Sequence, residues 1–242
     1  MKFKALSDKG KIRKINEDAY SVDYLSDTAL YAIVCDGMGG ANGGLTAASN
    51  ACDIIADRIK SSYSVSLNKN SARHLINSAI ETANSIIYDM SKVDKNLSGM
   101  GTTVVAALIV DNILLLAHAG DSRCYLLRHN ELYRLTVDHS IVQIMVDSGQ
   151  ITEAEANKHP NKNVITRALG TSKDIDLDFN EIALQQNDIV LLCTDGLTNS
   201  LSEQSILDVL NSNNFEDIPA KLVEKSNNAG GGDNITAVVL SL

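Results

Sequence analysis

Short apolar runs rich in β-branched residues recur along the chain and predict strands. Six such runs cover residues 30–35, 102–110, 113–119, 124–127, 189–194 and 235–240. Most of them are continuously apolar rather than alternating, which is the pattern of strands that are covered on both faces. Asp111 and Asn112 separate two of the runs and predict a tight hairpin turn, so at least part of the sheet structure is antiparallel.

Apolar residues spaced by three and four predict two long helices in the first half of the chain. The first stripe runs from Leu45 through Cys52 to Ile59, and a second stripe follows over residues 72–90. Each stripe would cover the face of a helix that packs on a core. Two early helices, central strands and a closing strand together predict an α+β protein with helices outside stacked sheets.

Three further helix signals lie in the second half of the chain. Thr152, with a glutamate three residues later, matches a capping box. Ser202 is a predicted N-cap, and Leu201 and Ile206 are placed to form a hydrophobic staple around it. The last helix is expected within residues 218–228.

Composition favours one compact domain over residues 1–242. The chain has only two prolines, Pro160 and Pro219, and it contains no repeat, low-complexity stretch or linker. Its 21 basic and 30 acidic residues give a formal charge of −9. This charge argues against a nucleic-acid partner, because proteins that bind nucleic acids carry a basic face.

The sequence favours a cytoplasmic location and no membrane partner. The basic N-terminus has no long apolar run behind it, unlike a secretory signal. The most apolar region, residues 104–119, is too short to span a bilayer and is interrupted by Asp111 and Asn112. The cysteines show no C-x-x-C spacing and are expected to be reduced, buried hydrophobes. They are Cys35, Cys52, Cys124 and Cys193.

Acidic residues recur beside glycines at the ends of the predicted strands. In "LYAIVCDGMGGANGG" a buried strand ends at Asp36 and a glycine-rich loop follows. Asp121 and Asp195 also come directly after strands, and Asp233 stands before the final strand after three glycines. An aspartate in such a position is usually a turn former, but the repetition of the pattern favours a shared function.

The glycine-rich loop after Asp36 allows two interpretations. A phosphate-binding loop would need a Gly-Lys-Ser/Thr ending, yet no lysine or arginine lies between Asp36 and Arg58. The alternative is that Asp36 is a metal ligand and that the glycines let the backbone and a substrate approach it closely.

Convergence of these acids would require a cation. Two carboxylates ~4 Å apart repel by roughly 4 kcal/mol at an effective dielectric constant of ~20. A set of oxygen ligands without histidine or cysteine suits Mn²⁺ or Mg²⁺ rather than zinc. Two such ions ~3.5–4 Å apart can lower the pKa of a bridging water and direct it at a phosphorus atom.

Several motifs, taken together and in order, resemble the metal-dependent serine/threonine protein phosphatases of type 2C in their small bacterial form. The motifs are "RKINEDA", "CDGMGG", "MGTTV", "GDSRCY", "DHS", "HPNKNVITRALG", "CTDGL" and "GGDNIT", and they extend over almost the whole chain. The resemblance implies a four-layer α-β-β-α sandwich of two stacked antiparallel sheets flanked by helices. It also implies a two-metal centre at one end of the sandwich.

Carried over position by position, the resemblance implies a role for each metal ligand. Asp36 would bridge the two tightly bound ions, and Gly37 would offer its carbonyl oxygen. Asp195 and Asp233 would complete the shell of one ion, and Glu17 would hold the other through water.

The resemblance also implies residues that support the two-ion centre. Asp121 would share a third, weaker ion with Asp195, and Asp18 would support the water network. Arg13 would clamp the phosphate, since a guanidinium fork matches two phosphate oxygens. Residues 140–165 correspond to a mobile flap over the mouth of the active site.

The chain departs from the small-bacterial pattern at two positions. Ala41 and Leu45 stand where a histidine and the glutamate of a Gly-Glu pair are usual. Because Leu45 begins the apolar helix stripe, we interpret the change as packing or an altered surface near the site. Met38 stands where the eukaryotic branch carries a histidine, a candidate general acid, and His118 and His139 are predicted to be structural.

The predicted function is hydrolysis of phosphoserine and phosphothreonine on proteins by a metal-bridged hydroxide, without a phosphoenzyme. The expected partners are phosphorylated protein substrates and a cognate serine/threonine kinase, and the protein is expected to be a monomer. One alternative is a catalytically weak module of the same fold that binds phosphoproteins, and another is a metal-dependent nuclease. A phosphatase dedicated to a sigma-factor regulatory cascade is a variant of the enzyme interpretation.

Overall fold

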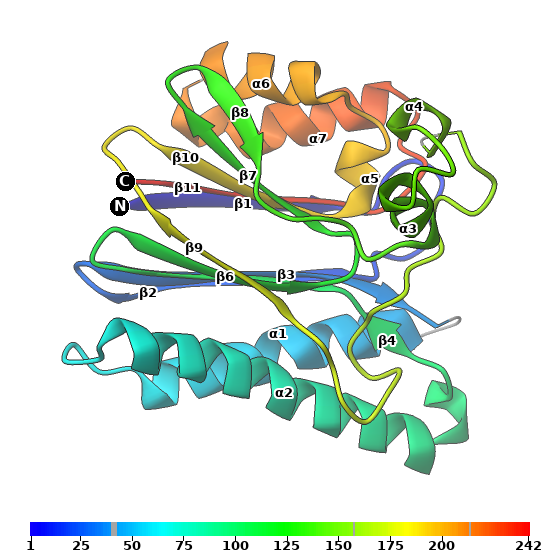
Figure 1. The fold of residues 1–242 in the computed structure, drawn as a ribbon, viewed down its shortest axis with the longest axis horizontal. Helices are drawn as coiled ribbons and strands as arrows, with labels where there is room; N and C mark the ends of the chain where they lie inside the picture. Colours follow the sequence, from blue (N-terminus) through cyan, green and yellow to red (C-terminus); the bar gives the residue numbers. More distant parts are fainter. Residues whose placement is uncertain (40–42, 157, 213) are drawn as a thin grey trace.

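Two antiparallel sheets lie face to face, and helices cover the outer face of each sheet (Figure 1). The computed structural model describes residues 1–39, 43–156, 158–212 and 214–242. This arrangement confirms the predicted α+β class and the four layers of the α-β-β-α sandwich.

The first sheet contains the two ends of the described chain. It has five strands in the order β1-β11-β10-β7-β8, and every pairing is antiparallel. Its strands are β1 (Lys2–Asp8), β7 (Arg123–Arg128), β8 (Glu131–Arg134), β10 (Ile189–Cys193) and β11 (Ile235–Ser241). The helices α5 (Asp195–Thr198), α6 (Glu203–Ser212) and α7 (Ile218–Asn228) pack on its outer face, with the 3₁₀ turn η2 (Phe215–Asp217) between the last two.

The second sheet is built mostly from the first half of the chain. It has six strands, with β2-β3-β5-β6-β9 in order and β4 paired to β3. Its strands are β2 (Asp18–Ser26), β3 (Ala29–Met38), β4 (Gly101–Thr102), β5 (Val104–Val110), β6 (Ile113–Ala119) and β9 (Asp178–Ala183). The long helices α1 (Gly43–Ser62) and α2 (Lys69–Val93), followed by η1 (Lys95–Leu97), cover its outer face.

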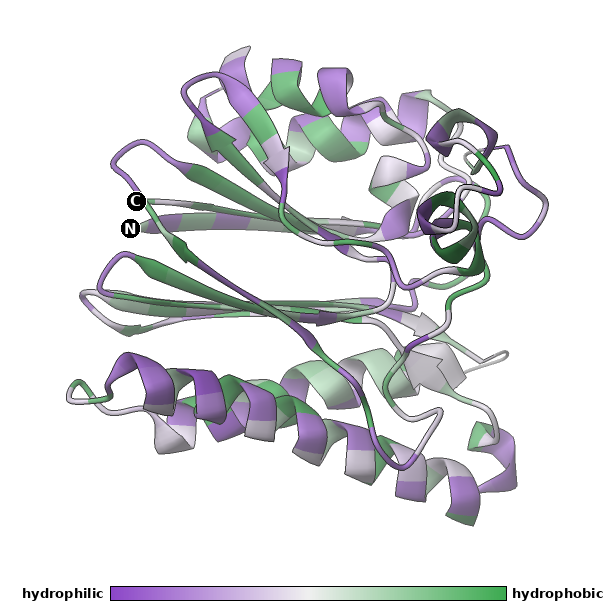
Figure 2. Cartoon of the chain, in the orientation of Figure 1, coloured by the Kyte–Doolittle hydropathy of each residue, from purple (hydrophilic) through white to green (hydrophobic). Residues whose placement is uncertain are grey.

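The position of β3 between two apolar layers explains its continuous hydrophobic run. Leu30 and Val34 face the first sheet and join the core between the sheets. Ile33 and Cys35 point the other way, into the core beneath α1 and α2. Because successive side chains of a strand point to opposite faces, a strand with two covered faces needs apolar residues at every position. Figure 2 shows these hydrophobic strands between polar outer helix faces.

All six predicted strands are present, with small changes at their ends. The run over 102–110 is divided between β4 and β5, and Thr194 lies just outside β10. Asp111 and Asn112 have φ angles of 48° and 65°, which are the left-handed values that a two-residue hairpin turn requires. The hairpin prediction is therefore confirmed.

The predicted helix signals are confirmed except at Leu45 and at Ile86, which belongs to the predicted stripe of α2 but is 40% exposed. The Thr152 amide donates to the Glu155 carboxylate and the Glu155 amide donates to Thr152 Oγ1, so the capping box is formed. The Ser205 amide likewise donates to Ser202 Oγ. Leu45, however, is 39% exposed and does not begin the buried stripe of α1. Its substitution alters the surface and not the packing, because small residues such as Ala47 form the buried start of that face.

Some predictions on composition can also be compared with the structure. All four cysteines are buried and free. No helix within the described residues is long and apolar enough to cross a membrane. Ala41 lies outside the described residues, so the structure does not address that departure from the family pattern.

Candidate active site

The acids predicted from the sequence come together at one end of the two sheets. Asp18 and Asp36 stand opposite each other in the pairing of β2 with β3. Asp195 begins α5, directly after β10 and Thr194, and Asp121 follows β6. The nearby carboxylates that raise the pKa of Asp36 are those of Asp18, Asp195, Asp121 and Asp233. Acids from distant parts of the chain therefore share one electrostatic environment.

Backbone and hydroxyl contacts fix the position of Asp36. Its amide donates to Thr103 Oγ1 at 2.9 Å, and its carbonyl oxygen accepts from the Thr103 amide and from Thr102 Oγ1, each at 2.9 Å. Burial and the neighbouring carboxylates raise the pKa of Asp36 well above its ordinary value. The backbone of Asp36 is thus fixed by hydrogen bonds, and ionisation of its carboxyl group is unfavourable unless a cation lies nearby.

Asp18 links the two sheets. It belongs to β2 of the second sheet, and its Oδ2 accepts hydrogen bonds from Thr194 Oγ1 (2.9 Å), just after β10, and from Thr236 Oγ1 (2.6 Å) of β11. The side chain is buried, and burial raises its pKa to about 7 despite these two hydrogen bonds. The other oxygen, Oδ1, is buried without a hydrogen-bond partner among the described residues.

Asp195 and Asp121 line a cavity together with residues of the segment 140–165, the predicted flap. Burial, followed by the charge of Asp233, raises the pKa of Asp195, which shares a hydrogen bond with the Asp36 carboxyl group. Asn199 Nδ2 donates to Asp195 Oδ2 at 2.9 Å. Burial and the charge of Asp195 raise the pKa of Asp121 to about 8.

Arg13 reaches the same site from the loop before β2. Its Nη2 donates to Asp233 Oδ2 at 2.9 Å, and the arginine side chain is half exposed. Asn234 holds this loop in place, because its Oδ1 accepts from the Glu17 amide at 2.8 Å and its Nδ2 donates to the Ile15 carbonyl at 2.9 Å. The exposed guanidinium is therefore held at the rim of the acidic cluster.

Glycines form a close cradle around Glu17. The Gly37 amide donates to the Glu17 carbonyl oxygen at 3.2 Å. A Cβ atom on Gly44 would lie 2.5 Å from Glu17 Oε1, and one on Gly37 would lie 2.1 Å from the Gly44 carbonyl oxygen. Any side chain at either position would therefore displace the backbone or Glu17. This close approach explains the glycines on either side of the loop after Asp36.

The donor set fits a hard divalent cation. Glu17 Oε1 and Asp18 Oδ1 are buried and lack hydrogen-bond partners within the described part of the chain. Buried polar atoms are normally paired, so unpaired carboxylate oxygens beside other carboxylates indicate a missing positive partner. Oxygen-only ligands of this kind suit Mn²⁺ or Mg²⁺. The assignment of Glu17, Asp36, Gly37, Asp121, Asp195 and Asp233 to particular ions, and of Arg13 to the phosphate, stays a prediction.

Several contacts in the site had not been predicted. Thr194 and Thr236 hydrogen-bond to Asp18, although neither was assigned a role. Asn199 was also missed, yet it stands four residues after Asp195, the spacing that brings two side chains to one face of a helix. The threonines gave no such local signal, because their acceptor lies more than 170 residues away in the chain.

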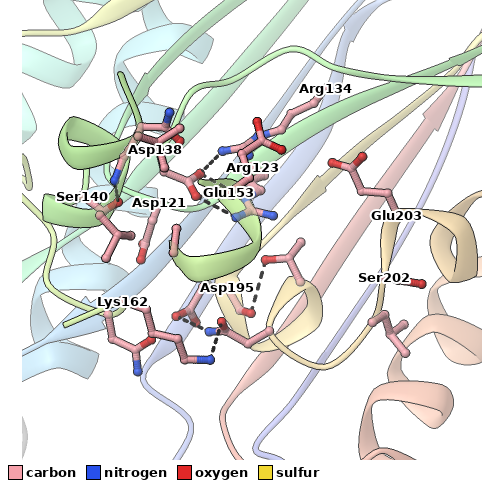
Figure 3. Close-up of a pocket in the computed structure, with 18 of the residues that line it drawn as sticks. Asp121, Arg123, Arg134, Asp138, Ser140, Glu153, Lys162, Asp195, Ser202 and Glu203 are labelled. Atoms are coloured by element: carbon pink, nitrogen blue, oxygen red, sulfur yellow. Dashed lines mark hydrogen bonds and ion pairs between the residues drawn. The ribbon is translucent and has the colours of Figure 1, made fainter. Parts of the chain in front are cut away.

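A cavity of about 390 Å³ opens beside the acids, between the flap and the helices α5 and α6. The predicted flap, residues 140–165, contains α3 (Ile141–Asp147) and α4 (Glu153–Ala156). Asp121, Asp195 and Lys162 line this cavity, and Lys162 Nζ donates to Asn199 Oδ1 at 3.4 Å beside Asp195 (Figure 3). Arg123 and Arg134 both hold Asp138 at its wall. The cavity therefore reaches two acids of the cluster, Asp121 and Asp195.

Fold and site together define a class of protein: an α-β-β-α sandwich that gathers buried carboxylates at one end of its sheets. Residues 11–230 match the family model described as "Protein phosphatase 2C". The chain belongs to this family, and the predicted class of enzyme, a protein-serine/threonine phosphatase, is confirmed by that membership.

Two relatives match over nearly their whole length. The serine/threonine phosphatase stp of Listeria welshimeri is 36% identical over 235 residues, which cover 97% of this chain and 93% of the relative. The protein phosphatase PhpP of Streptococcus pneumoniae is 36% identical over 244 residues, covering 100% of this chain and 98% of the relative.

Solved structures share the fold. The serine/threonine phosphatase Stp1 from Staphylococcus aureus has a TM-score of 0.93 at 30% identity, covering 99% of this chain and 94% of its own. The catalytic domain of the phosphatase PstP, in complex with two manganese ions, has a TM-score of 0.85 at 34% identity. That match covers 98% of this chain and 96% of the PstP chain.

Proposed function

We propose that this protein removes phosphate from phosphoserine and phosphothreonine residues of proteins in a metal-dependent reaction. Residues 1–242 would act as one catalytic domain, with residues 140–165 as its flap. The observation that supports this proposal most directly is the convergence of four other carboxylates on Asp36. Membership of a phosphatase family supports the choice of phosphate as the group that reacts.

Each residue of the acidic cluster would hold a particular ion. Asp36 would bridge two tightly bound ions, with Asp195 and Asp233 completing one shell and Glu17 and the Gly37 carbonyl serving the other side. When bound, Mn²⁺ or Mg²⁺ would lower the pKa of water and neutralise phosphate charge, so that water attacks phosphorus without a phosphoenzyme. The two manganese ions in the related PstP structure support this choice of metal.

The remaining residues would position the substrate and complete the site. Arg13, half exposed at the rim, would donate two N–H groups to the phosphate oxygens. Asp18, held by two threonine hydroxyls, would orient the water network of the neighbouring ion. Asp121 and Asp195 would share a third, weaker ion below the flap.

The biological setting follows from the same proposal. The substrates would be phosphorylated proteins of the cytoplasm, and the enzyme would act as a monomer against a serine/threonine kinase. A catalytically weak phosphoprotein-binding module is not favoured, because the chain retains every acid that the metal centre requires.

The test is a phosphopeptide assay with removal of the metal and of its ligands. We expect activity in Mn²⁺, none in EDTA, and a loss of about 100-fold or more in Asp36→Asn and in Asp195→Asn, since even outer-shell partners of a metal cost 10–100-fold. Calorimetry should show weaker Mn²⁺ binding by the same variants. Asp57→Asn, an exposed change on α1, is the matched control and should behave as wild type. Full activity of either site variant in EDTA would overturn the proposal.

A further inference from the structure

Two histidines stack beneath the flap. His118 belongs to β6 and His139 follows β8, and their ring centroids lie 4.7 Å apart with planes inclined by 11°. Both side chains are buried. The sequence had suggested only a structural role for them, and neither belongs to the acidic cluster.

His139 makes two hydrogen bonds to the residue that precedes Asp121. Its amide donates to the Gly120 carbonyl oxygen at 2.9 Å, and its Nδ1 accepts from the Gly120 amide at 3.1 Å. Gly120 has a φ of +111°, and a Cβ atom there would lie 2.6 Å from the side chain of Thr103. The conformation that directs Asp121 into the site is therefore one that only glycine adopts readily. His139 holds this conformation through both polar groups of the Gly120 backbone.

The same histidine stands where the two ends of the flap meet. Its carbonyl oxygen accepts from the Thr166 amide at 2.8 Å. The next residue, Ser140, forms an isolated antiparallel bridge with Ile165. One residue thus contacts both the base of the flap and the backbone beside Asp121.

The other ring nitrogen of His139, Nε2, also has polar neighbours. Nε2 lies 3.4 Å from Asp178 Oδ2, while Arg167 Nη1 donates to Asp178 Oδ1 at 2.7 Å. Burial lowers the pKa of His139, which favours the neutral imidazole. Because Nδ1 accepts the Gly120 N–H, a neutral ring carries its proton on Nε2. This nitrogen faces Asp178 Oδ2 at 3.4 Å and Arg167 Nη1 at 3.1 Å.

The contacts do not favour a metal site at these histidines. The ligand atoms of His118, His139 and Asp178 lie within 4.8 Å of one another. However, the Arg167 guanidinium already occupies this position, 3.1 Å from His139 Nε2 and bonded to Asp178. Nearly parallel stacked rings also direct their lone pairs along parallel planes and not toward a common point. The group is a hydrogen-bonded support.

We propose that His139 is a positioning residue for Asp121 and that it couples this carboxylate to the base of the flap. The inference rests on the proposed function, because it assigns Asp121 to the weaker third ion. Loss of the Nδ1 acceptor would free the Gly120 amide and let Asp121 rotate away from Asp195. The two tightly bound ions would be unaffected, since Glu17, Asp36 and Asp233 lie on other segments of the chain.

Two substitutions test the contributions of Nδ1 and Nε2 of His139 separately. His139→Asn keeps an acceptor near the position of Nδ1, whereas His139→Gln keeps a polar group near Nε2 and loses that acceptor. In calorimetric Mn²⁺ titrations of the whole protein, we expect the Gln variant to bind its weakest ion about tenfold less tightly, the lower end of the effect of outer-shell partners. The Asn variant should stay near wild type. Hydrogen exchange over residues 140–166 should accelerate in the Gln variant alone.

The phosphopeptide assay gives a second measurement. The Mn²⁺ concentration for half-maximal activity should rise about tenfold in the Gln variant, in line with the loss of an outer-shell partner. His74→Ala, an exposed change on α2, is the control. Equal loss of thermal stability in the Asn and Gln variants with unchanged Mn²⁺ dependence would overturn the inference, as would a wild-type protein that binds only two ions. Those results leave the phosphatase proposal standing, whereas a wild-type protein without Mn²⁺-dependent activity would refute both.

Discussion

Gly44 illustrates how closely single residues are fitted around the candidate metal centre. It lies in the first turn of α1, where alanine would normally stabilise the helix by about 1 kcal/mol relative to glycine. Here a Cβ atom would lie 2.5 Å from Glu17 Oε1 and 2.8 Å from the Gly37 carbonyl oxygen. The steric cost therefore exceeds the gain in helix propensity.

We expect Gly44→Ala to lower thermal stability and to weaken Mn²⁺ binding, because Glu17 or the Gly37 backbone must move. Thermal unfolding and calorimetric titration with Mn²⁺ measure the two effects. Gly232→Ala is the matched control near the same site, since a Cβ atom there would meet nothing within 4 Å. A Gly44→Ala protein with higher stability and unchanged Mn²⁺ affinity would contradict the expected clash.

Residues with a local signature could be predicted from the sequence, and residues defined only by tertiary contacts could not. Asp36 and Asp195 were recognised because each follows an apolar strand and precedes a glycine. Thr194 and Thr236 donate to Asp18 only after two sheets have stacked, so nothing near them in the sequence indicates that role. Leu45 was assigned to the wrong face because its spacing fits the stripe of α1 while its position at the helix start leaves it exposed.

Strands covered on both faces could be recognised from the sequence, and half-exposed strands could not. The strands β3, β5 and β6 are continuously apolar because each lies between two layers of core. In contrast, β1 and β9 are edge strands, and their exposed positions carry residues such as Lys2 and Glu181. Their mixed composition resembles that of a loop, and only pairing with a neighbouring strand defines them.

The capping box of α4 gives a prediction at the scale of one element. Thr152→Ala removes one of its two reciprocal bonds and the hydroxyl contact to Glu155, at a cost of about 0.5–2 kcal/mol to this helix. Because α4 lies in the predicted flap and contributes only Ala156 to the buried residues, global thermal stability should change little.

The measurement is hydrogen exchange over residues 152–156, which should accelerate in Thr152→Ala. Thr152→Ser keeps the hydroxyl and should retain the protection of the wild type. Equal exchange in all three proteins would show that contacts other than the cap hold the flap helix.

At the scale of the whole molecule, the acidic cluster makes stability depend on pH in the absence of metal. The pKa values of Asp18 and Asp121 rise from 3.8 to about 7 and about 8, respectively. Between the ordinary pKa of 3.8 and these raised values, the folded protein binds more protons than the unfolded chain. The free energy of unfolding therefore falls as pH rises. The lowered pKa values of His118 and His139 oppose this trend only below their ordinary value of 6.5.

We therefore expect the melting temperature in EDTA to fall between pH 7 and pH 8.5. Saturating Mn²⁺ should reduce or reverse the fall, because ligand protons are displaced by the ion. Differential scanning fluorimetry at both conditions measures the effect, and Asp121→Asn should flatten the slope in EDTA. A metal-free melting temperature that rises over this range would contradict the assigned pKa directions.

The overall architecture followed from motifs spread over almost the whole chain, whereas the way the sheets meet did not. The family resemblance implied two stacked sheets with a metal centre at one end, and it implied which residues would be the ligands. It did not show that Asp18 of one sheet is held by threonines of the other, since those contacts depend on how these particular side chains pack.

The pairing of β1 with β11 has a consequence for synthesis of the protein. Asp18 and Asp36 leave the ribosome early, whereas Asp233, Thr236 and the partner strand of β1 are translated more than 190 residues later. A nascent chain therefore carries its first acids without the opposite half of their surroundings. Because Asp233 and Thr236 are the last of these residues to be translated, the candidate site is complete only after β11 has been made.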